Sequence, residues 1–481
     1  MMPHSDSVTR RYLYIYPYFF SLALSCLLCL LPSPAAGHPL LKKYIIEYNL
    51  TAIEKSLKDD SYRGEAGILR IRPEAADKLG IKVFIDEDYH DAIRLFKEAE
   101  NALEKARKFM QSRERGKSPG YFAKNIADNL ILYKTISLEA KNKLLDYRSR
   151  LNPEVDQRLN NSICEGVLDR LLEEGLAKTD NRLRDGLAYL YNMCQGVNRR
   201  HFPLTADNIP FINYVFNSFL EHAPEKDIEL YDLDRDDAHR SARQDLDWKA
   251  AFGSEISEFI GIIETVLKKY GEEIHDVDPL LFVALMKKES DFRSMAVSPM
   301  GAAGLTQIMP STAKEMGMNN IFLPEYYNDA LLLVKQERES RNQAMAALFK
   351  ITEDDNKLQY AEQARSLMQA SLDMRQQREA LIKRYKKELL AEQTDERLDP
   401  AKAIEYGLVY FAGLMKAQQG DISLALASYN AGGQRIGEHK GIPPISETVG
   451  FRNEVLQYYR DYLSKVVKIS GDEVSKGEGL R

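Results

Sequence analysis

The sequence predicts a mostly α-helical protein, with a helical region in its first half, a compact helical domain in its second half, and a helical hairpin inserted into that domain. Three observations lead to this prediction. The chain has 481 residues, enough for two or three domains at ~100–200 residues each. Apolar residues recur at helical spacing from 88 to 270. The segment 325–398 has neither glycine nor proline and consists mainly of strong helix formers.

The composition is that of a globular chain, with 44% hydrophobic and 29% charged residues. The net charge is −6, so the chain has no general basic excess with which to bind a polyanion. Nucleic acid is therefore not expected as a partner.

Residues 1–37 have the pattern of a secretory signal peptide. Arg10 and Arg11 precede an apolar run over 12–31, and small residues and prolines follow directly over 32–37. We therefore expect an exported protein. The alternative is a retained N-terminal membrane anchor, because the apolar run is close to the length that spans a bilayer.

Two of the four cysteines lie in the predicted signal, which leaves Cys164 and Cys194. Their spacing fits neither a zinc site nor a redox pair. They could form a disulfide in an oxidising compartment, or remain two buried thiols. No sequence motif points to a metal or a cofactor, and neither is expected.

Residues 38–250 are predicted to form a mainly helical accessory region. Two segments, 67–72 and 81–85, have the composition of short strands or extended segments. The region beyond them has apolar residues three and four apart, beginning with Ala92, Leu95, Phe96 and Ala99. No motif in this region indicates a function.

A buried helix is predicted to begin at Asp278-Pro279, because aspartate is a good N-cap and proline suits the first helical position. The helix is apolar on most sides over 280–286 and then reaches Glu289. A glutamate near a helix end is usually a solvated surface residue. Burial, however, would raise the pKa of the carboxyl group, and a carboxyl that stays protonated near neutral pH can act as a general acid.

Four sequence blocks give Glu289 a context. The first is Glu289-Ser290-Asp291-Phe292, and the second is Gly301-Ala302-Ala303-Gly304-Leu305-Thr306-Gln307-Ile308-Met309-Pro310. The third is Ala427-Ser428-Tyr429-Asn430-Ala431-Gly432, and the fourth is Glu447-Thr448. In this order they resemble the soluble lytic transglycosylase family, whose catalytic domain has a lysozyme-like fold. The resemblance implies a lysozyme-like domain over 255–465, and a periplasmic location, free or membrane-associated.

The resemblance also implies an activity and a set of site residues. Glu289 would be the single catalytic acid and base, cleaving the N-acetylmuramic acid–N-acetylglucosamine bond of peptidoglycan and closing a 1,6-anhydro ring without water. Peptidoglycan strands would be the partner. The residues that match substrate-binding positions are Ser298, Met300, Gly301, Gln307, Tyr429 and Asn430. Glu447 matches a buried glutamate that supports the structure.

Two other functions are compatible with these residues. A hydrolytic muramidase on the same fold would usually need a second carboxylate. Asp291 does not supply one, because two residues along a helix place it on another face. A peptidoglycan-binding scaffold without activity is the other alternative. Outside the four blocks, Ser298 would be a turn residue, Gln307 a surface amide and Tyr429 a core aromatic, and Glu447 would be an N-cap or exposed.

The insertion over 325–398 is predicted to form two antiparallel helices, 325–351 and 357–394, separated by a break at 352–356. One narrow apolar seam runs along the second helix, through Leu358, Ala361, Ala364 and Leu367. We expect the hairpin to pack on itself and to project from the domain or lie along it.

The charged face of the hairpin carries Lys383, Arg384, Lys386 and Lys387. A charge run of this kind is usually solvated, but it could also meet acidic cell-wall polymer or a membrane surface. The hairpin is therefore a hypothetical docking site for a cell-envelope protein. The tail over 470–481 is polar and contains glycine, and we expect it to be flexible.

Overall fold

The computed structural model describes residues 38–59, 61–197, 204–234, 247–275, 277–392 and 394–478, with the side chains of the last helix described as far as 466. The predicted signal peptide over 1–37 lies outside these ranges. Every regular element within them is a helix, and β-pairing is limited to isolated bridges. The prediction of a mostly α-helical protein is therefore confirmed.

The first half of the chain contains a small helical body and one long hairpin. The hairpin consists of α4 (Glu87–Gln111) and α5 (Pro119–Ser149). The body contains α2 (Pro39–Lys58), α3 (Pro73–Leu79), η1 (Gln157–Leu159), α6 (Asn161–Lys178), α7 (Leu183–Cys194), α8 (Ile209–His222) and α9 (Glu225–Ile228). Its core includes side chains from α2, α6, α7 and α8.

The second half likewise consists of a helical body and one long hairpin. Its hairpin consists of α14 (Glu325–Lys350) and α15 (Lys357–Glu392). The remaining helices are α10 (Trp248–Phe252), α11 (Ser254–Tyr270), η4 (Gly271–Glu273), α12 (Pro279–Ser290), α13 (Pro310–Glu315), η5 (Glu396–Leu398), α16 (Pro400–Ala417), α17 (Ile422–Ala431), α18 (Gly433–His439) and α19 (Ser446–Glu478). Helix α12 lies in the middle of their core, since all seven residues from Leu280 to Met286 are buried.

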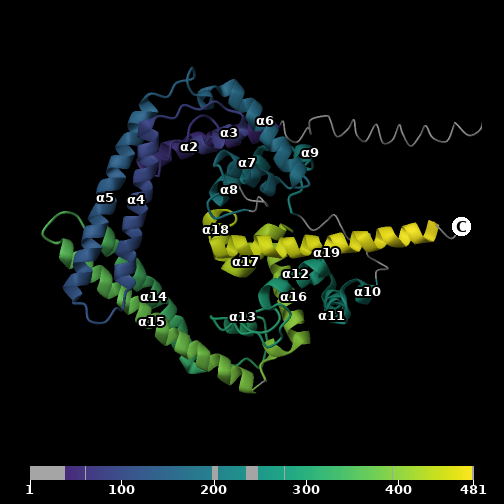
Figure 1. Cartoon of the computed structure of the whole chain (residues 1–481). Coiled ribbons are helices and arrows are strands. Elements are labelled where there is room, and N and C mark those ends of the chain that lie inside the picture. Colours follow the sequence, from purple (N-terminus) through teal and green to yellow (C-terminus); the bar gives the residue numbers. More distant parts are fainter. Residues whose placement is uncertain are drawn as a thin grey trace, which may run out of the picture.

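The two hairpins meet and close the chain into a ring, with α4 and α5 along one side and α14 and α15 along the other (Figure 1). Small apolar residues fill the contact, among them Ala106, Ala127, Ala361 and Ala364. The Nζ of Lys134 donates to the carbonyl oxygens of Phe349 and Ile351, at 2.8 and 2.7 Å. The predicted insertion therefore packs on the first half of the chain as well as on itself.

The halves also meet at the opposite side of the ring. Arg452 on α19 donates to Asp234 at 2.6 Å and to Asp185 at 3.1 Å, and all three side chains are buried. Arg184 donates to Asp421 at 2.5 Å. Buried cations with several carboxylate partners fix the relative position of the two halves, because separating them would leave a charge unpaired in the interior.

Several sequence-based expectations need correction. Residues 67–70 form a tight turn with one bridge at Ile71, and 81–85 are irregular, so neither segment is a strand. Leu358 is 46% exposed and lies outside the apolar seam. Helix α19 extends as far as Glu478, and the flexibility expected of the tail from 470 stays a prediction.

The two hairpin helices begin at the predicted residues and end one and two residues earlier than predicted. Cys164 and Cys194 are buried free thiols, which was one of the two alternatives. Among the helices of the described ranges, none has both the length and the apolar character needed to cross a bilayer.

Candidate active site

Helix α12 presents Glu289 at its C-terminal end. Asp278 caps the first turn by accepting from the amide of Leu280 at 2.9 Å, and Pro279 occupies the first helical position. At the other end the Oγ of Ser290 donates to the carbonyl oxygen of Leu305 at 2.8 Å. This bond ties the end of α12 to the following loop and so fixes the position of the neighbouring glutamate.

Glu289 is a carboxyl group without an internal counter-ion. Within the described residues it forms no ion pair and no side-chain hydrogen bond, because the adjacent Lys288 pairs with Glu454 at 2.6 Å. Burial raises the pKa of Glu289 from 4.5 to about 8, and the like charge of Glu447 adds to that rise, whereas Lys288 opposes it. The carboxyl is therefore protonated at neutral pH.

The loop from Ser298 to Ile308 is built around glycine. Gly304 has φ of 81°, and a Cβ atom there would lie 1.7 Å from the carbonyl oxygen of Arg397. Only glycine fits such a close approach of two backbones. Gln307 also has positive φ, and its Nε2 donates to the carbonyl oxygens of Ala296 and Gly304 at 3.0 and 2.8 Å.

One cavity, of about 660 Å³, opens between this loop and Glu289. Ser298 and Gln307, two of the predicted substrate-binding residues, line it, and so does Lys386 from α15. The Oγ of Ser298 accepts from the amides of Met300 and Ala302 at 3.1 and 3.0 Å, so the hydroxyl proton remains available to another acceptor.

A second cavity, of about 320 Å³, shares Glu289 with the first. Its other walls include Asn430 at the end of α17, and Glu447 and Phe451 at the start of α19. The Oδ1 of Asn430 accepts from the hydroxyl of Thr448 at 2.8 Å, which leaves the amide nitrogen as a donor. Glu289 therefore lies where two cavities adjoin, the arrangement required to act on a bond between two bound sugar units.

Tyr429 lies close enough to Glu289 for the glutamate's charge to contribute to raising its pKa, although burial is the larger cause. The hydroxyl donates to the carbonyl oxygen of Thr306 at 2.6 Å. Because its only proton is used in that bond, this hydroxyl can only accept from a second neighbour.

Three predicted site residues are placed differently from the expectation. Met300 and Gly301 do not line either cavity; Met300 accepts from the hydroxyl of Tyr327 through its backbone carbonyl, and Gly301 is buried against the same ring. Glu447 is exposed rather than buried. It is thus a second carboxylate beside Glu289, which the sequence did not indicate.

Lys386 is the cavity residue whose place could not be derived from the sequence. The sequence indicated Lys386 only as part of a charged run on the hairpin, and no sequence pattern specified that this part of α15 lies beside Glu289. Among the described residues, no cluster of histidine, cysteine, aspartate and glutamate is placed to hold a metal ion.

The site residues fall within a recognised domain. Residues 267–332 and 337–447 match the family model described as "Transglycosylase SLT domain". Two solved structures resemble the chain in part. The lytic transglycosylase Slt of Pseudomonas aeruginosa, an inactive mutant, is 14% identical over 94% of this chain and 75% of its own, with a TM-score of 0.27. The 70 kDa soluble lytic transglycosylase of Escherichia coli is 14% identical over 81% of this chain and 64% of its own, with a TM-score of 0.26. At these scores the whole chains do not superpose closely. The likeness to the transglycosylase SLT family therefore rests on the domain match over 267–332 and 337–447, which is less than half of the 481 residues.

Proposed function

We propose that the protein is a peptidoglycan lytic transglycosylase that cleaves the β-1,4 bond between N-acetylmuramic acid and N-acetylglucosamine without consuming water. One observation carries the proposal: Glu289 is a carboxyl whose pKa is raised to about 8, at the junction of two cavities. Such a group holds the proton that the leaving oxygen needs.

The proton balance requires only this one carboxyl. Glu289 gives its proton to the glycosidic oxygen as the bond from that oxygen to C1 of the muramic residue breaks. The resulting carboxylate then takes the proton of the C6 hydroxyl, and O6 bonds to C1. Glu289 is protonated again at the end, and the product is a 1,6-anhydro sugar.

The surrounding groups fit these steps. The Tyr429 hydroxyl, held by Thr306, can accept from protonated Glu289 and so stabilise the acid form. Ser298 and the amide of Asn430 offer donors on either side of Glu289. Lys386 offers a positive charge, which suits the carboxylate that each muramic residue carries.

A hydrolytic muramidase is the second candidate, and Glu447 is the observation that favours it. A carboxylate on the same cavity as Glu289 could orient a water molecule for attack on C1. In a lytic transglycosylase the role of Glu447 is instead electrostatic: its charge helps to keep Glu289 protonated.

Mass spectrometry of purified cell wall digested by the protein distinguishes the two. We expect products that lack one water, and no such products with the Glu289→Gln variant. Products of full hydrolytic mass would refute the lyase proposal in favour of a muramidase. Equal digestion by the wild type and Glu289→Gln would refute Glu289 as the catalytic group, and no digestion by the wild type would leave a binding scaffold.

The location and any protein partner are separate proposals. We propose export through the signal peptide over 1–37, which N-terminal sequencing of protein from the cell envelope would test. A cell-envelope protein could dock only on the outer face of 325–398, because α4 and α5 already cover the buried seam. Loss of envelope localisation on substituting that outer face would support such docking, whereas unchanged localisation would oppose it.

A further inference from the structure

The glycine loop beside Glu289 has a counterpart in the first half of the chain. The counterpart is Gly64-Glu65-Ala66-Gly67-Ile68-Leu69-Arg70-Ile71-Arg72-Pro73, which parallels Gly301-Ala302-Ala303-Gly304-Leu305-Thr306-Gln307-Ile308-Met309-Pro310. In each loop the two glycines and the residue three places after the second have positive φ: 90°, 74° and 51° in the first half, and 86°, 81° and 48° in the second. An antiparallel bridge closes each loop, between Ala66 and Ile71 and between Ala303 and Ile308.

A buried arginine holds the first-half loop in place. The Nη1 of Arg158 donates to the carbonyl oxygens of Gly64 and Ile71 at 2.8 and 3.0 Å. Its Nη2 donates to the hydroxyl of Tyr147 and to Asp156, both at 2.7 Å. The guanidinium therefore satisfies one backbone loop, one tyrosine of the hairpin and one carboxylate.

The second half repeats this arrangement atom for atom. The Nη1 of Arg397 donates to the carbonyl oxygens of Gly301 and Ile308 at 3.1 and 3.2 Å. Its Nη2 donates to the hydroxyl of Tyr385 and to Asp395, both at 2.7 Å. In each half, a Cβ atom on the second glycine would lie 1.7 Å from the carbonyl oxygen of this arginine.

The elements around the two loops also correspond. Each loop leads into a short proline-opened helix (α3 or α13), then a long hairpin, a 3-10 turn and two further helices. Helix α7 carries Asn192, which accepts from Asn208 at 3.3 Å, as Asn430 on α17 accepts from Thr448 at 2.8 Å. The first half is therefore a second copy of the fold that carries Glu289.

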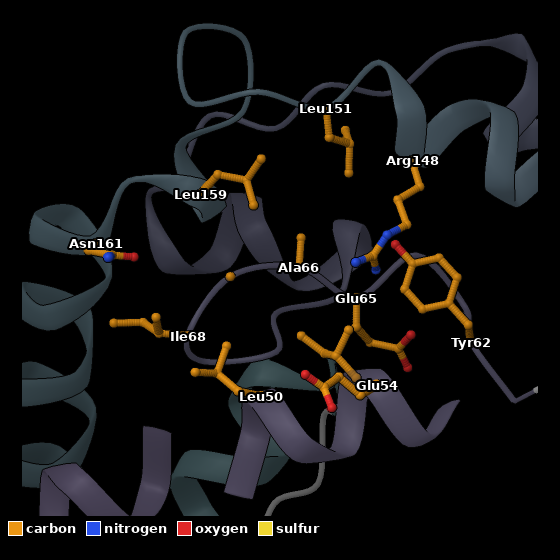
Figure 2. A pocket seen from close by; sticks show the side chains of 12 residues that line it. Leu50, Glu54, Tyr62, Glu65, Ala66, Ile68, Arg148, Leu151, Leu159 and Asn161 are labelled. Atoms are coloured by element: carbon orange, nitrogen blue, oxygen red, sulfur yellow. The ribbon is translucent and has the colours of Figure 1, made fainter. Parts of the chain in front are cut away.

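This second copy has a cleft of its own, of about 560 Å³ (Figure 2). The side chains of Leu50 and Glu54 reach it from α2, and the guanidinium of Arg148 lies beside the ring of Tyr62, 5.3 Å from its centroid. The remaining lining residues are Ile53, Glu65, Ala66, Gly67, Ile68, Leu151, Leu159 and Asn161. The cleft has apolar faces that can pack on a sugar ring, carboxylates that can accept from sugar hydroxyls, and one cation that can pair with an acid group of the sugar.

The walls of this cleft correspond in part to those of the cavity at Glu289. Each is lined by a helix that precedes the glycine loop, α2 or α12, and by residues of the segment that includes the loop. Arg148 follows Tyr147 on α5 as Lys386 follows Tyr385 on α15, so each cavity receives a cation from the same position of its hairpin. A positive charge kept in both places suits an anionic group common to both ligands.

The catalytic carboxyl group of Glu289 has no counterpart in the described part of the first half of the chain. Counted from the prolines that open the two helices, Pro39 and Pro279, the position of Glu289 is occupied in α2 by Asn49. Asn49 is 3% exposed, and an amide there has no proton to give to a leaving oxygen. Glu54 does line the cleft, but it is exposed, unlike the position of Glu289 at the end of a buried helix.

We propose that the cleft of Leu50, Tyr62 and Arg148 is a second binding site for the muramic-acid-containing glycan strand, which holds the strand without cutting it. The proposal rests on the proposed function for its ligand, because the copy at Glu289 defines which sugar this fold would bind. Arg148 would pair with the carboxylate of a muramic residue. With this second site, the protein would bind long glycan strands with a higher affinity than the catalytic groove alone provides.

The test is titration calorimetry on the full chain carrying Glu289→Gln, so that the ligand stays intact. The probe is a soluble N-acetylglucosamine–N-acetylmuramic acid oligosaccharide too short to reach both sites. We expect two equivalents per chain. Adding Arg148→Glu should weaken the cleft roughly tenfold or more, leaving one equivalent. Leu50→Glu, on a residue that is 46% exposed, should do the same without risk to folding.

Lys105→Glu provides the matched control, because it makes the same charge change on an exposed part of α4. It should retain two equivalents. One equivalent in the Glu289→Gln chain, or two in the Arg148→Glu chain, would overturn the proposal. A chain with Glu289 intact that releases no anhydro product would instead refute the proposed function, so the two failures are distinguishable.

Discussion

Replacing Glu289 by glutamine should stabilise the folded chain, and the gain should grow with pH. The folded chain holds this carboxyl with a pKa of about 8, against 4.5 for the ordinary group. The contribution of this group to the free energy of unfolding is thus fully present below pH 4.5 and is lost as the pH rises to about 8. The reason is that the group ionises readily in the unfolded chain, whereas burial disfavours its ionisation in the folded chain. At ~1.4 kcal/mol per pKa unit, the whole loss is on the order of 5 kcal/mol. Solvent screening of the half-buried side chain reduces it to about 2 kcal/mol.

Urea unfolding at about pH 5 and about pH 8 measures this difference. The free energy of unfolding of Glu289→Gln, minus that of the wild type, should be about 2 kcal/mol larger at the higher pH. Other titrating groups cancel in that subtraction. The exposed Glu258 on α11 is the control, and Glu258→Gln should change little at either pH. A constant difference between the Glu289→Gln and wild-type curves would refute burial as the reason that Glu289 keeps its proton.

Three further outcomes are expected. Glu447→Gln removes a like charge beside Glu289, so the pKa of Glu289 should fall. The pH at which activity declines on the alkaline side should therefore move down by roughly half a unit. Complete loss of activity would indicate that Glu447 is a hydrolytic base instead. Gly304→Ala should destabilise the chain by roughly 2 kcal/mol more than Gly317→Ala in thermal unfolding, since both have positive φ but only the former meets a backbone oxygen. Ala364→Glu should place a charge in the seam between the hairpins and open the ring, which small-angle X-ray scattering would report as a larger radius of gyration; an unchanged radius would contradict that role of the seam.

The features that were predictable from the sequence are local. The bounds of α14 and α15 follow from an uninterrupted run of helix formers between breaks, and helix propensity depends on neighbours along the chain. The burial of α12 follows from its apolar residues. Glu289 was singled out by the four sequence blocks that resemble a known family, and these are also local patterns. Cap residues such as Asp278 could be identified for the same reason.

The features that were not predictable depend on where distant elements meet. Exposure of Glu447 is set by the packing of α19 against α12 and α17, which no local pattern specifies. Five of the ten aligned residues of the two glycine loops are identical, but the repeat was hidden because 67–72 has the composition of a strand. What the copies share is geometry: positive φ at three positions and one buried arginine.

Helix α15 connects the ring closure to the chemistry. It has 36 residues, and at about 1.5 Å per residue it is a single element roughly 54 Å long. Ala361 and Ala364 near its start pack against the first-half hairpin, whereas Lys386 near its end lines the cavity of Glu289. The position of that lysine is therefore set from both ends, by the seam and by the Tyr385–Arg397 hydrogen bond. The first half of the chain thus supports the active site through the hairpin contact, whether or not its own cleft holds a strand.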